Sequence, residues 1–252
     1  MRLIVKVGTQ VISGKAGLNK RRIGQIIKEI AELFKLGHEV VLVSSGAIGA
    51  GLSHVSFEGS ARKKVAAAIG QPLLIQAYIN SAKKYKLSIG QVLILGDDFS
   101  NKKHFKNFAL NLNAMLSHKI LPIINENDVM KREDLRVNDN DMLSAMVATG
   151  LRAKKLIILT NQEGFYTRNP DKHRDAKLIK KVPHLTDEIK SLCNKGKSRL
   201  GVGGMFAKIK ATEYATARGV ETFIGSGEKK GTILGALGAD FTGTRFASHK
   251  IK

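Results

Sequence analysis

The sequence predicts an α/β protein: a three-layer αβα sandwich around a mainly parallel, doubly wound sheet. Two observations support this fold class. Short runs of branched apolar residues alternate with longer stretches of helical periodicity along the whole chain. Several of these runs are apolar without interruption, as strands buried on both faces of a sheet require. Such sheets bind ligands at the carboxyl ends of their strands, so we expect the functional residues there.

The first half of the chain begins with a strand, helix, strand pattern. Residues 2–7 predict the first strand, and 39–44, with a continuous apolar centre, predict the second. Asn19 is suited to cap a helix over 20–36, in which apolar residues recur at i, i+3 and i+4 until Gly37. The remaining elements expected in this half are helices over 61–69, 73–86 and 104–118 and strands over 90–95 and 120–125.

The second half continues the alternation. A helix over 139–151 leads into a strand over 155–160, and the polar stretch around Pro170 is expected to be a surface loop. The elements that follow are expected as helices over 186–194 and 205–218 and strands over 221–224 and 243–247. We therefore expect one domain over 1–252, with one lobe formed by about 1–150 and the other by about 151–252.

The composition favours a globular protein of a reducing compartment. The chain has 43% hydrophobic residues, enough for a sizeable core, and only one cysteine, Cys193, so it cannot form an intrachain disulfide. Its longest apolar runs, at 40–43 and 156–159, are far shorter than the roughly 20 residues that span a bilayer. The first residues, MRLIVKVG, do not resemble a secretory signal. We expect a cytoplasmic protein without a membrane partner.

The net charge of +21 is unusual and could indicate a nucleic-acid partner. The lysines are scattered, however, and tryptophan is absent, so platforms for base stacking are scarce. A lysine-rich solvated surface is the favoured interpretation, and its positive field would attract anionic substrates such as ATP. A basic nucleic-acid-binding module is the alternative from another functional class.

Small, polar and charged residues gather at the predicted strand ends and helix starts. Lys6 precedes a glycine turn at Gly8, SSGAIGAG follows the second strand, and INEND at 124–128 ends another. NDND at 138–141 opens a helix, and GVGG at 201–204 opens the helix of Lys208. Phosphoryl transfer needs such donors, cations and carboxylates. Taken singly, each feature has a plainer interpretation: a turn glycine, an N-cap for Asp141, or a surface lysine for Lys208.

Other motifs do not fit the sequence. GKS at 196–198 lacks the glycine of a Walker A loop at position 191 and no strand precedes it. The histidines form no HExxH or paired-ligand spacing, so no protein metal site is predicted. Asp97 and Asp98 could bind a metal, but helix capping is the favoured interpretation.

A set of strings, read together, resembles the glutamate 5-kinase family of the amino-acid kinase superfamily. In order along nearly the whole chain these strings are VKVGT at 5–9, SSGAIGAG at 44–51, GQPLLIQ at 70–76, INEND at 124–128, DNDMLSA at 139–145, LTNQEGFYT at 159–167 and GVGGMFAK at 201–208. The resemblance implies an amino-acid kinase-like fold. Many members of the family also carry a C-terminal PUA domain, and we expect this chain to represent the catalytic domain without it.

The resemblance assigns a role to individual residues. Lys6, Lys208 and Asp141 are implied as catalytic: the lysines grip the phosphates and the aspartate holds them. The implied substrate-binding residues are Ser45, Gly46, Ala47, Asp128 and Asn140. The implied ATP-binding residues are Lys6, Gly8, Thr160, Asn161, Gly201, Val202, Gly203, Gly204, Met205 and Lys208. The chain departs from the family pattern at Asn161, where an acidic residue is usual, and at Asn138, Val202 and Phe206.

The implied activity is transfer of the γ-phosphoryl group of ATP, with Mg²⁺, to the side-chain carboxylate of L-glutamate, the first step of proline biosynthesis. The amino acid would bind the first lobe and ATP the second. The family also suggests a homo-oligomer, a dimer or tetramer, and delivery of the product to a glutamyl phosphate reductase. The alternative within the superfamily is a kinase that acts on a different carboxylate, carbamate or phosphate.

Overall fold

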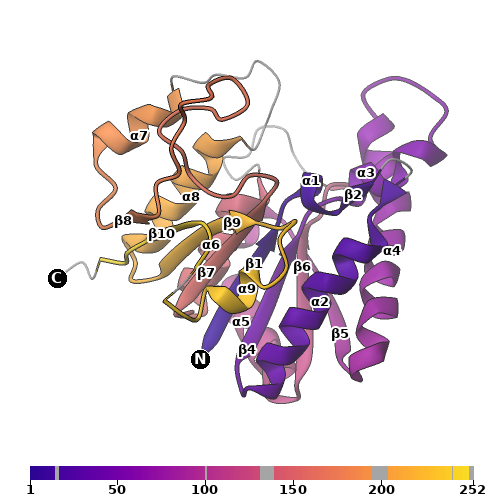
Figure 1. Cartoon of the computed structure of the whole chain (residues 1–252). Coiled ribbons are helices and arrows are strands. Elements are labelled where there is room, and N and C mark those ends of the chain that lie inside the picture. Colours follow the sequence, from indigo (N-terminus) through magenta and orange to yellow (C-terminus); the bar gives the residue numbers. More distant parts are fainter. Residues whose placement is uncertain (15–16, 100, 131–138, 195–203, 240, 250–252) are drawn as a thin grey trace.

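The computed structural model describes residues 1–14, 17–99, 101–130, 139–194, 204–239 and 241–249. The described residues form an eight-stranded sheet with helices on both faces (Figure 1). A short antiparallel pair, β2 (Ser13–Gly14) and β3 (Gly17–Leu18), lies outside this sheet. The three-layer αβα fold class predicted from the sequence is confirmed.

The large sheet has the strand order β5-β6-β4-β1-β7-β9-β10-β8. Its strands are β1 (Arg2–Val7), β4 (Glu39–Ser44), β5 (Ser88–Ile94), β6 (Ile120–Glu126), β7 (Lys155–Thr160), β8 (Lys181–Val182), β9 (Glu221–Ser226) and β10 (Thr244–Phe246). Neighbouring strands run parallel from β5 through β6, β4, β1 and β7 to β9. Strand β10 pairs antiparallel with β9. The chain builds outward from β1 first on the β4 side and then on the β7 side. The end of β1 is therefore the topological switch point, where such sheets bind ligands.

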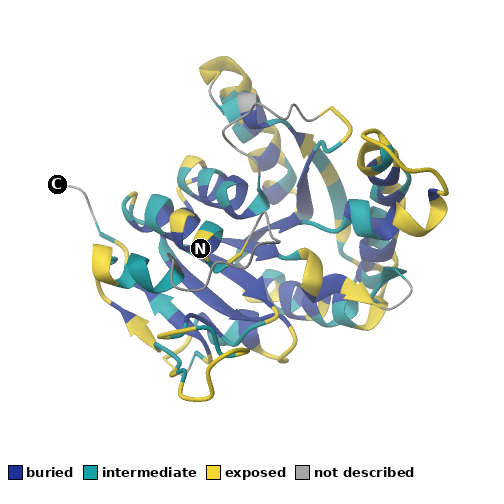
Figure 2. Ribbon diagram, turned by 90° about the horizontal axis from the view of Figure 1, so that it is seen from above, coloured by how far each residue is buried: buried dark blue, intermediate teal, exposed yellow. Residues whose placement is uncertain are grey.

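Each face of the sheet has its own hydrophobic core. One core packs Leu3, Val5 and Val7 of β1 against α2 (Lys20–Lys35) and α4 (Arg62–Ala82). The other packs Ile4 against α5 (Lys102–Ser117), α6 (Asn140–Gly150) and α8 (Met205–Thr216). Seen from above, the buried strands lie between partly exposed helices (Figure 2). Because alternate residues of a strand share a face, Lys6 lies on the Ile4 side, under α6 and α8.

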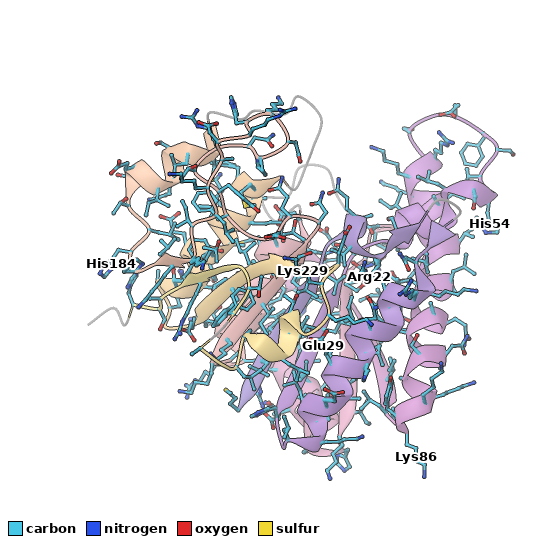
Figure 3. The ribbon with its side chains drawn as sticks, in the orientation of Figure 1. Arg22, Glu29, His54, Lys86, His184 and Lys229 are labelled. Atoms are coloured by element: carbon cyan, nitrogen blue, oxygen red, sulfur yellow. The ribbon has the colours of Figure 1, made fainter. Side chains whose placement is uncertain are left out.

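The remaining helices are short. They are α1 (Thr9–Ile12), α3 (Ala47–Gly51), α7 (Asp187–Asn194) and α9 (Thr232–Gly235), with 3₁₀ turns at Leu52–His54, Lys83–Tyr85 and Gly96–Phe99. Glu29 of α2 lies beside α9 (Figure 3) and accepts hydrogen bonds from the N–H groups of Gly231 and Ile233, both at 2.9 Å. This buried carboxylate caps α9 across a large sequence separation. No helix of the described ranges is long and apolar enough to span a bilayer.

Local sequence signals explain several element boundaries. The side chain of Asn19 accepts a hydrogen bond from the N–H of Arg22 at 3.0 Å, which is the predicted N-cap of α2. Gly37 follows the helix with φ of +77°, a conformation that favours glycine. The strands predicted over 2–7, 39–44 and 155–160 match β1, β4 and β7 to the residue.

The prediction of separate helices over 61–69 and 73–86 is wrong. A single helix, α4, runs through both segments with Pro72 inside it. Proline removes one helical hydrogen bond, and packing offsets this cost because Leu74 and Tyr78 are buried on one face. Gly70 also brings α4 against α3: a Cβ added there would lie 1.8 Å from the carbonyl oxygen of Ala47. Only glycine permits this contact.

Candidate active site

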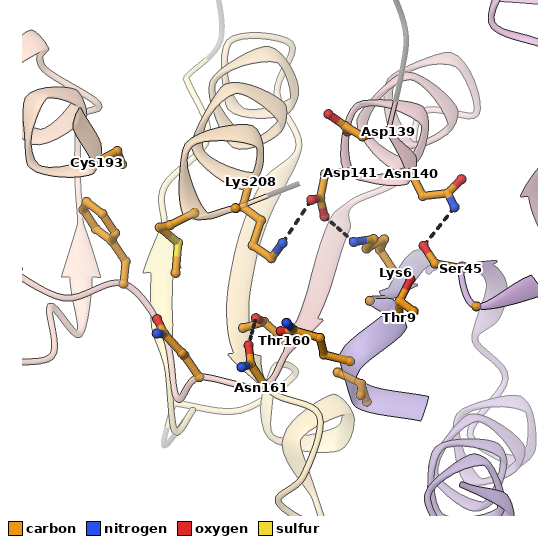
Figure 4. A pocket seen from close by; sticks show the side chains of 18 of the residues that line it. Lys6, Thr9, Ser45, Asp139, Asn140, Asp141, Thr160, Asn161, Cys193 and Lys208 are labelled. Carbon is orange, nitrogen blue, oxygen red and sulfur yellow. Dashed lines mark hydrogen bonds and ion pairs between the residues drawn. The ribbon is translucent and has the colours of Figure 1, made fainter. Parts of the chain in front are cut away.

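A cleft of about 730 Å³ opens at the carboxyl ends of the parallel strands. Segments far apart in the sequence contribute to it: the ends of β1, β4, β6 and β7 and the starts of α6 and α8 (Figure 4). Its predicted site residues are Lys6, Gly8, Ser45, Gly46, Asp128, Asn140, Asp141, Thr160, Asn161, Gly204, Met205 and Lys208. The strand-end rule therefore located the cleft correctly.

The centre of the cleft is a buried ion-pair cluster. The carboxylate of Asp141 lies between two ammonium groups, with Oδ1 2.6 Å from Nζ of Lys6 and Oδ2 3.0 Å from Nζ of Lys208 (Figure 4). These residues are 1%, 4% and 7% exposed, respectively. Each oxygen of one carboxylate thus holds one lysine, and the two cations converge from opposite ends of the sequence.

The local structure explains how the three residues meet. Lys6 projects from the central strand toward α6, and Asp141 lies in the first turn of α6. The N-cap of that helix is Asp139, whose side chain accepts from the N–H of Met142 at 2.7 Å. Asp141 is therefore free to pair with the lysines, and its interpretation as an N-cap is wrong. Lys208, on the first turn of α8, is buried, so its interpretation as a surface lysine is also wrong.

The cluster carries a net positive charge because two cations share one anion. Burial lowers the pKa of Lys6, and the nearby charge of Lys208 lowers it further. The carboxylate of Asp141 raises this pKa but offsets only part of the lowering. For Asp141, burial alone would raise the pKa, but Lys6 and Lys208 together bring it below its ordinary value. Asp141 is therefore a carboxylate at neutral pH, and the site is suited to attract an anion such as a triphosphate.

A second part of the cleft contains a network of neutral hydroxyl and amide groups. Nδ2 of Asn140 donates to Oγ of Ser45 at 2.8 Å and to Oδ1 of Asn125 at 3.0 Å. Gly46, which follows Ser45 in the sequence, has a φ of +107° and is the N-cap residue of α3. Ala47, predicted as a substrate contact, is 1% exposed and does not belong to the described lining of the cleft.

The other end of the cleft contains the predicted nucleotide residues. Thr160 ends β7, and its hydroxyl donates to Oδ1 of Asn161 at 3.1 Å. Gly8 forms the turn after β1, and its N–H donates to the carbonyl oxygen of Leu159 at 3.2 Å. Met205 and Gly204 start α8 at the same end. The predicted residues Gly201, Val202 and Gly203, and Asn138, lie outside the described residues.

Several lining residues were not predicted. Glu126 and Asp139 lie in the strings INEND and DNDM, which were the available signal for them. Phe165 and Cys193 line the end near Met205, and no sequence signal marked them as part of a site. Burial raises the pKa of Cys193 to about 11, so its thiol is protonated at neutral pH.

Asp98 was predicted to cap a helix. The structure instead caps α5 with Asn101, whose side chain accepts from the N–H groups of Lys103 and His104. Asp98 accepts from the N–H of Leu95 at 2.8 Å within the 3₁₀ turn. Because Leu95 directly precedes the 3₁₀ helix Gly96–Phe99, this contact caps the start of that helix, so the helix-capping interpretation is confirmed for Asp98 there and not at α5. Within the described ranges, no group of three or more His, Cys, Asp or Glu residues is arranged to hold a metal ion.

The fold is that of an α/β kinase, and comparison with known proteins identifies the family. The chain belongs to the amino acid kinase family, whose pattern matches residues 1–226. Among curated relatives, a glutamate 5-kinase of Clostridium acetobutylicum is 39% identical over 250 residues, which cover 97% of this chain and 94% of that protein. A glutamate 5-kinase of Pasteurella multocida is also 39% identical over 250 residues, covering 97% of this chain and 68% of that protein.

Solved structures support the fold. An isopentenyl phosphate kinase of T. acidophilum, in its product complex, superposes with a TM-score of 0.70 at 16% identity and covers 98% of this chain and 100% of that one. A carbamate kinase from Giardia lamblia bound to AMP-PNP superposes with a TM-score of 0.70 at 15% identity, covering 98% of each chain. The resemblance to glutamate 5-kinases read from the sequence is confirmed by the relatives.

Proposed function

We propose that the chain transfers the γ-phosphoryl group of ATP to the side-chain carboxylate of L-glutamate. The product is L-glutamyl 5-phosphate, and the reaction is the first step of proline biosynthesis. The observation that carries the proposal is the buried cluster in which Asp141 holds Lys6 and Lys208 at 2.6 and 3.0 Å. The glutamate 5-kinase relatives supply the acceptor.

The chemistry requires electrostatic stabilisation more than proton transfer. The glutamate side chain has an ordinary pKa of about 4.3, so the nucleophile is already ionised at neutral pH and needs no general base. One carboxylate oxygen forms the new bond to the γ-phosphorus while the bond from that phosphorus to the β,γ-bridging oxygen breaks, and ADP leaves with the electron pair. The obstacle is the approach of an anion to a polyanion.

Lys6 and Lys208 remove that obstacle. Their ammonium groups lie on opposite sides of Asp141 in the same cleft, so both can donate to oxygens of the transferring group or the leaving group. Preorganised cations in a water-poor site stabilise the charge of the transition state without reorganising. Asp141 does not react. It holds the two lysines at a fixed separation and offsets their mutual repulsion.

The site also fits a magnesium–nucleotide complex, because the carboxylates of Glu126 and Asp139 line the cleft that contains the lysines. Phosphate oxygens and water would hold Mg²⁺ chiefly, and the carboxylates of Glu126 and Asp139 would supply protein oxygens of suitable charge. The ion would supply charge neutralisation at the triphosphate. The part played by this chain's own residues is to keep the lysines and carboxylates in one enclosed space.

The two lobes divide substrate binding. Residues of about 1–150 bind the amino acid: Asp128 pairs with its ammonium group, and Ser45 and Asn140 contact it. Of the backbone donors expected over Ser45–Ala47, the N–H of Ser45 already donates to the carbonyl oxygen of Val7 at 3.2 Å, which leaves those of Gly46 and Ala47 for the anionic groups of the amino acid. Residues of about 151–252 bind ATP through Thr160, Asn161 and residues 201–205, joined by Lys6 and Gly8 from the first lobe. Asn161 contacts the nucleotide as a neutral amide in place of a charge.

The product is an acyl phosphate, which water hydrolyses readily. We therefore assign to the chain a cytoplasmic setting in which a glutamyl phosphate reductase consumes the product at once. A homo-oligomer, either a dimer or a tetramer, is the proposed assembly.

Purified protein supplied with ATP, Mg²⁺ and a panel of acceptors tests the proposed function. We expect ADP release that depends on L-glutamate, with trapping of the acyl phosphate as a hydroxamate. Aspartate, N-acetylglutamate, carbamate and isopentenyl phosphate serve as competitors in the panel. ADP release with one of these acceptors and none with glutamate would refute the proposal.

A further inference from the structure

We infer that Gln71, on α4 and outside the described lining of the cleft, is a positioning residue that, together with the backbone N–H of Glu126, holds the direction of the hydrogen bonds offered to glutamate. It acts through Asn125 and Asn140, which connect it to Ser45. This inference rests on the proposed function, because it assigns roles to groups that face the amino acid.

A backbone group fixes the direction of the hydrogen bonds that run from Gln71 to Ser45. The N–H of Glu126 donates to Oδ1 of Asn125 at 2.9 Å. A backbone N–H can only donate, so the atom that faces it must be the carbonyl oxygen of the Asn125 amide. The amide nitrogen of Asn125 therefore points the other way and donates to Oε1 of Gln71 at 2.8 Å. Asn125 is 1% exposed, so water does not compete for these bonds.

The same logic orients Asn140. Its Nδ2 faces acceptors, with Oδ1 of Asn125 at 3.0 Å, Oγ of Ser45 at 2.8 Å and the carbonyl oxygen of Ser44 at 3.5 Å. Ser45 Oγ is consequently an acceptor in this contact and keeps its own proton to donate into the cleft. Oδ1 of Asn140 is buried and has no hydrogen-bond partner within the described ranges.

Ser45 and Asn140 both line the cleft, so a bound amino acid meets an oriented donor in the Ser45 hydroxyl, and the buried, unsatisfied Oδ1 of Asn140 is an acceptor that it reaches after a local shift of the Asn140 side chain. The Ser45 hydroxyl suits a carboxylate, and the Asn140 carbonyl oxygen suits an ammonium group. These are the two charged groups on the α-carbon of glutamate. A reversed Asn140 amide would present a donor where the ammonium group needs an acceptor.

Helix α4 also contacts the segment Ser44–Ser45, at the end of β4, through a second residue. The hydroxyl of Ser44 donates to the carbonyl oxygen of Ser45 at 3.0 Å, so the contact of 2.9 Å with the Tyr78 hydroxyl must have Tyr78 as donor. Tyr78 is fully buried, and burial raises its pKa, so its phenol keeps the proton. Gln71 and Tyr78 are seven positions apart, about two helical turns, and therefore project from the same face of α4.

The test compares steady-state kinetics of the wild-type chain with Gln71→Leu. Leucine leaves the buried amide nitrogen of Asn125 without its acceptor, so the Asn125 amide is held only at its oxygen and fixes the position of Asn140 less firmly. We expect KM for glutamate to rise by about tenfold, in proportion to the loss of one well-oriented hydrogen bond to a charged group. KM for ATP and kcat should change by less than about twofold, since the lysine cluster is untouched.

Two matched variants separate positioning from structure. Gln71→Glu keeps an acceptor for Asn125 and should restore KM for glutamate to within about threefold of wild type. Gln76→Leu makes the same change on the exposed side of α4, where Gln76 contacts only Asn80 in the described structure, and should leave the kinetics unchanged. Tyr78→Phe, which removes one oxygen, should raise KM for glutamate by about threefold.

The inference is overturned if Gln71→Leu leaves KM for glutamate unchanged, or raises KM for ATP equally. It is also overturned if Gln71→Glu is as impaired as Gln71→Leu. Should Gln71→Leu not fold, Gln71→Glu and Tyr78→Phe decide by the same measurement. Failure of the proposed function is distinguishable, because the wild-type chain itself would then show no ADP release that depends on glutamate.

Discussion

The two parts of the cleft are built on different physical principles. The cluster of Lys6, Asp141 and Lys208 is charged and buried, and it draws its residues from three distant elements. The relay from Gln71 to Ser45 is neutral and depends on which way each amide points. Charge acts over several ångströms and stabilises a transition state, whereas oriented dipoles act at contact and select a substrate. Substitutions in the first part should therefore change turnover, and those in the second should change glutamate affinity.

The largest effect is expected for Asp141→Asn. The amide leaves two buried ammonium groups without their shared counter-ion, and breaking a buried ion pair typically costs about 3–5 kcal/mol of unfolding free energy. Denaturant unfolding at neutral pH measures this loss. The loss should shrink at alkaline pH as the lysines become neutral. An unchanged free energy of unfolding would show that Asp141 does not stabilise the two buried lysines.

Lys208→Ala should lower kcat by about 100-fold or more, by analogy with other lost transition-state donors, while KM for glutamate changes little. Lys210→Ala is the matched control, because Lys210 is exposed on the same helix and lies over the ring of Phe206. Initial rates of ADP release at saturating substrates measure both. Near-wild-type turnover of Lys208→Ala would remove the distinction between the two parts of the cleft.

Asp128→Ala should act on the recognition part alone. Because Asp128 is proposed to bind the ammonium group, which does not react, KM for glutamate should rise by about tenfold with a small change in kcat. Varying glutamate at saturating ATP, and then ATP at saturating glutamate, measures the two constants separately. A raised KM for ATP with an unchanged KM for glutamate would reassign Asp128 to the nucleotide.

The smallest effect concerns pH. Burial and the neighbouring Lys208 place the pKa of Lys6 below the ordinary lysine value of 10.5. The ammonium group is therefore lost as pH rises through that lowered pKa, and kcat/KM for ATP should fall on the alkaline side below pH 10.5. Lys6→Arg, which keeps its charge, should move this decline to higher pH. On the acid side, Asp141 stays ionised below its ordinary value of 3.8 and should add no decline near neutral pH.

Much of the fold could be predicted because buried parallel strands have continuous apolar centres. β1, β4 and β7 matched to the residue for this reason. The continuous helix α4 could not be predicted, because Pro72 is a strong local signal for a break and the packing that overrides it comes from α3. Short elements such as α1, β8 and α9 have too few residues to show a period.

The candidate site was predicted in outline and not in its details. Strand ends brought Lys6 and Asp141 to the same edge of the sheet, so their meeting followed from the fold class. The hydrogen-bond relay through Asn125 could not be predicted, since it joins a contact with the N–H of Glu126 to a contact with Gln71 across 54 positions. The separation of Asp139 as the cap from Asp141 as the ion-pair partner likewise required the geometry of the helix start.

The most direct test of the central claim is a double-mutant cycle on the two lysines. If Lys6 and Lys208 act on one phosphoryl group through Asp141, each alanine variant should lose kcat strongly and the double variant should lose far less than the product of the two. Single-turnover rates with ATP and glutamate give the three values. Losses that multiply fully, or one lysine without effect, would contradict a single shared centre.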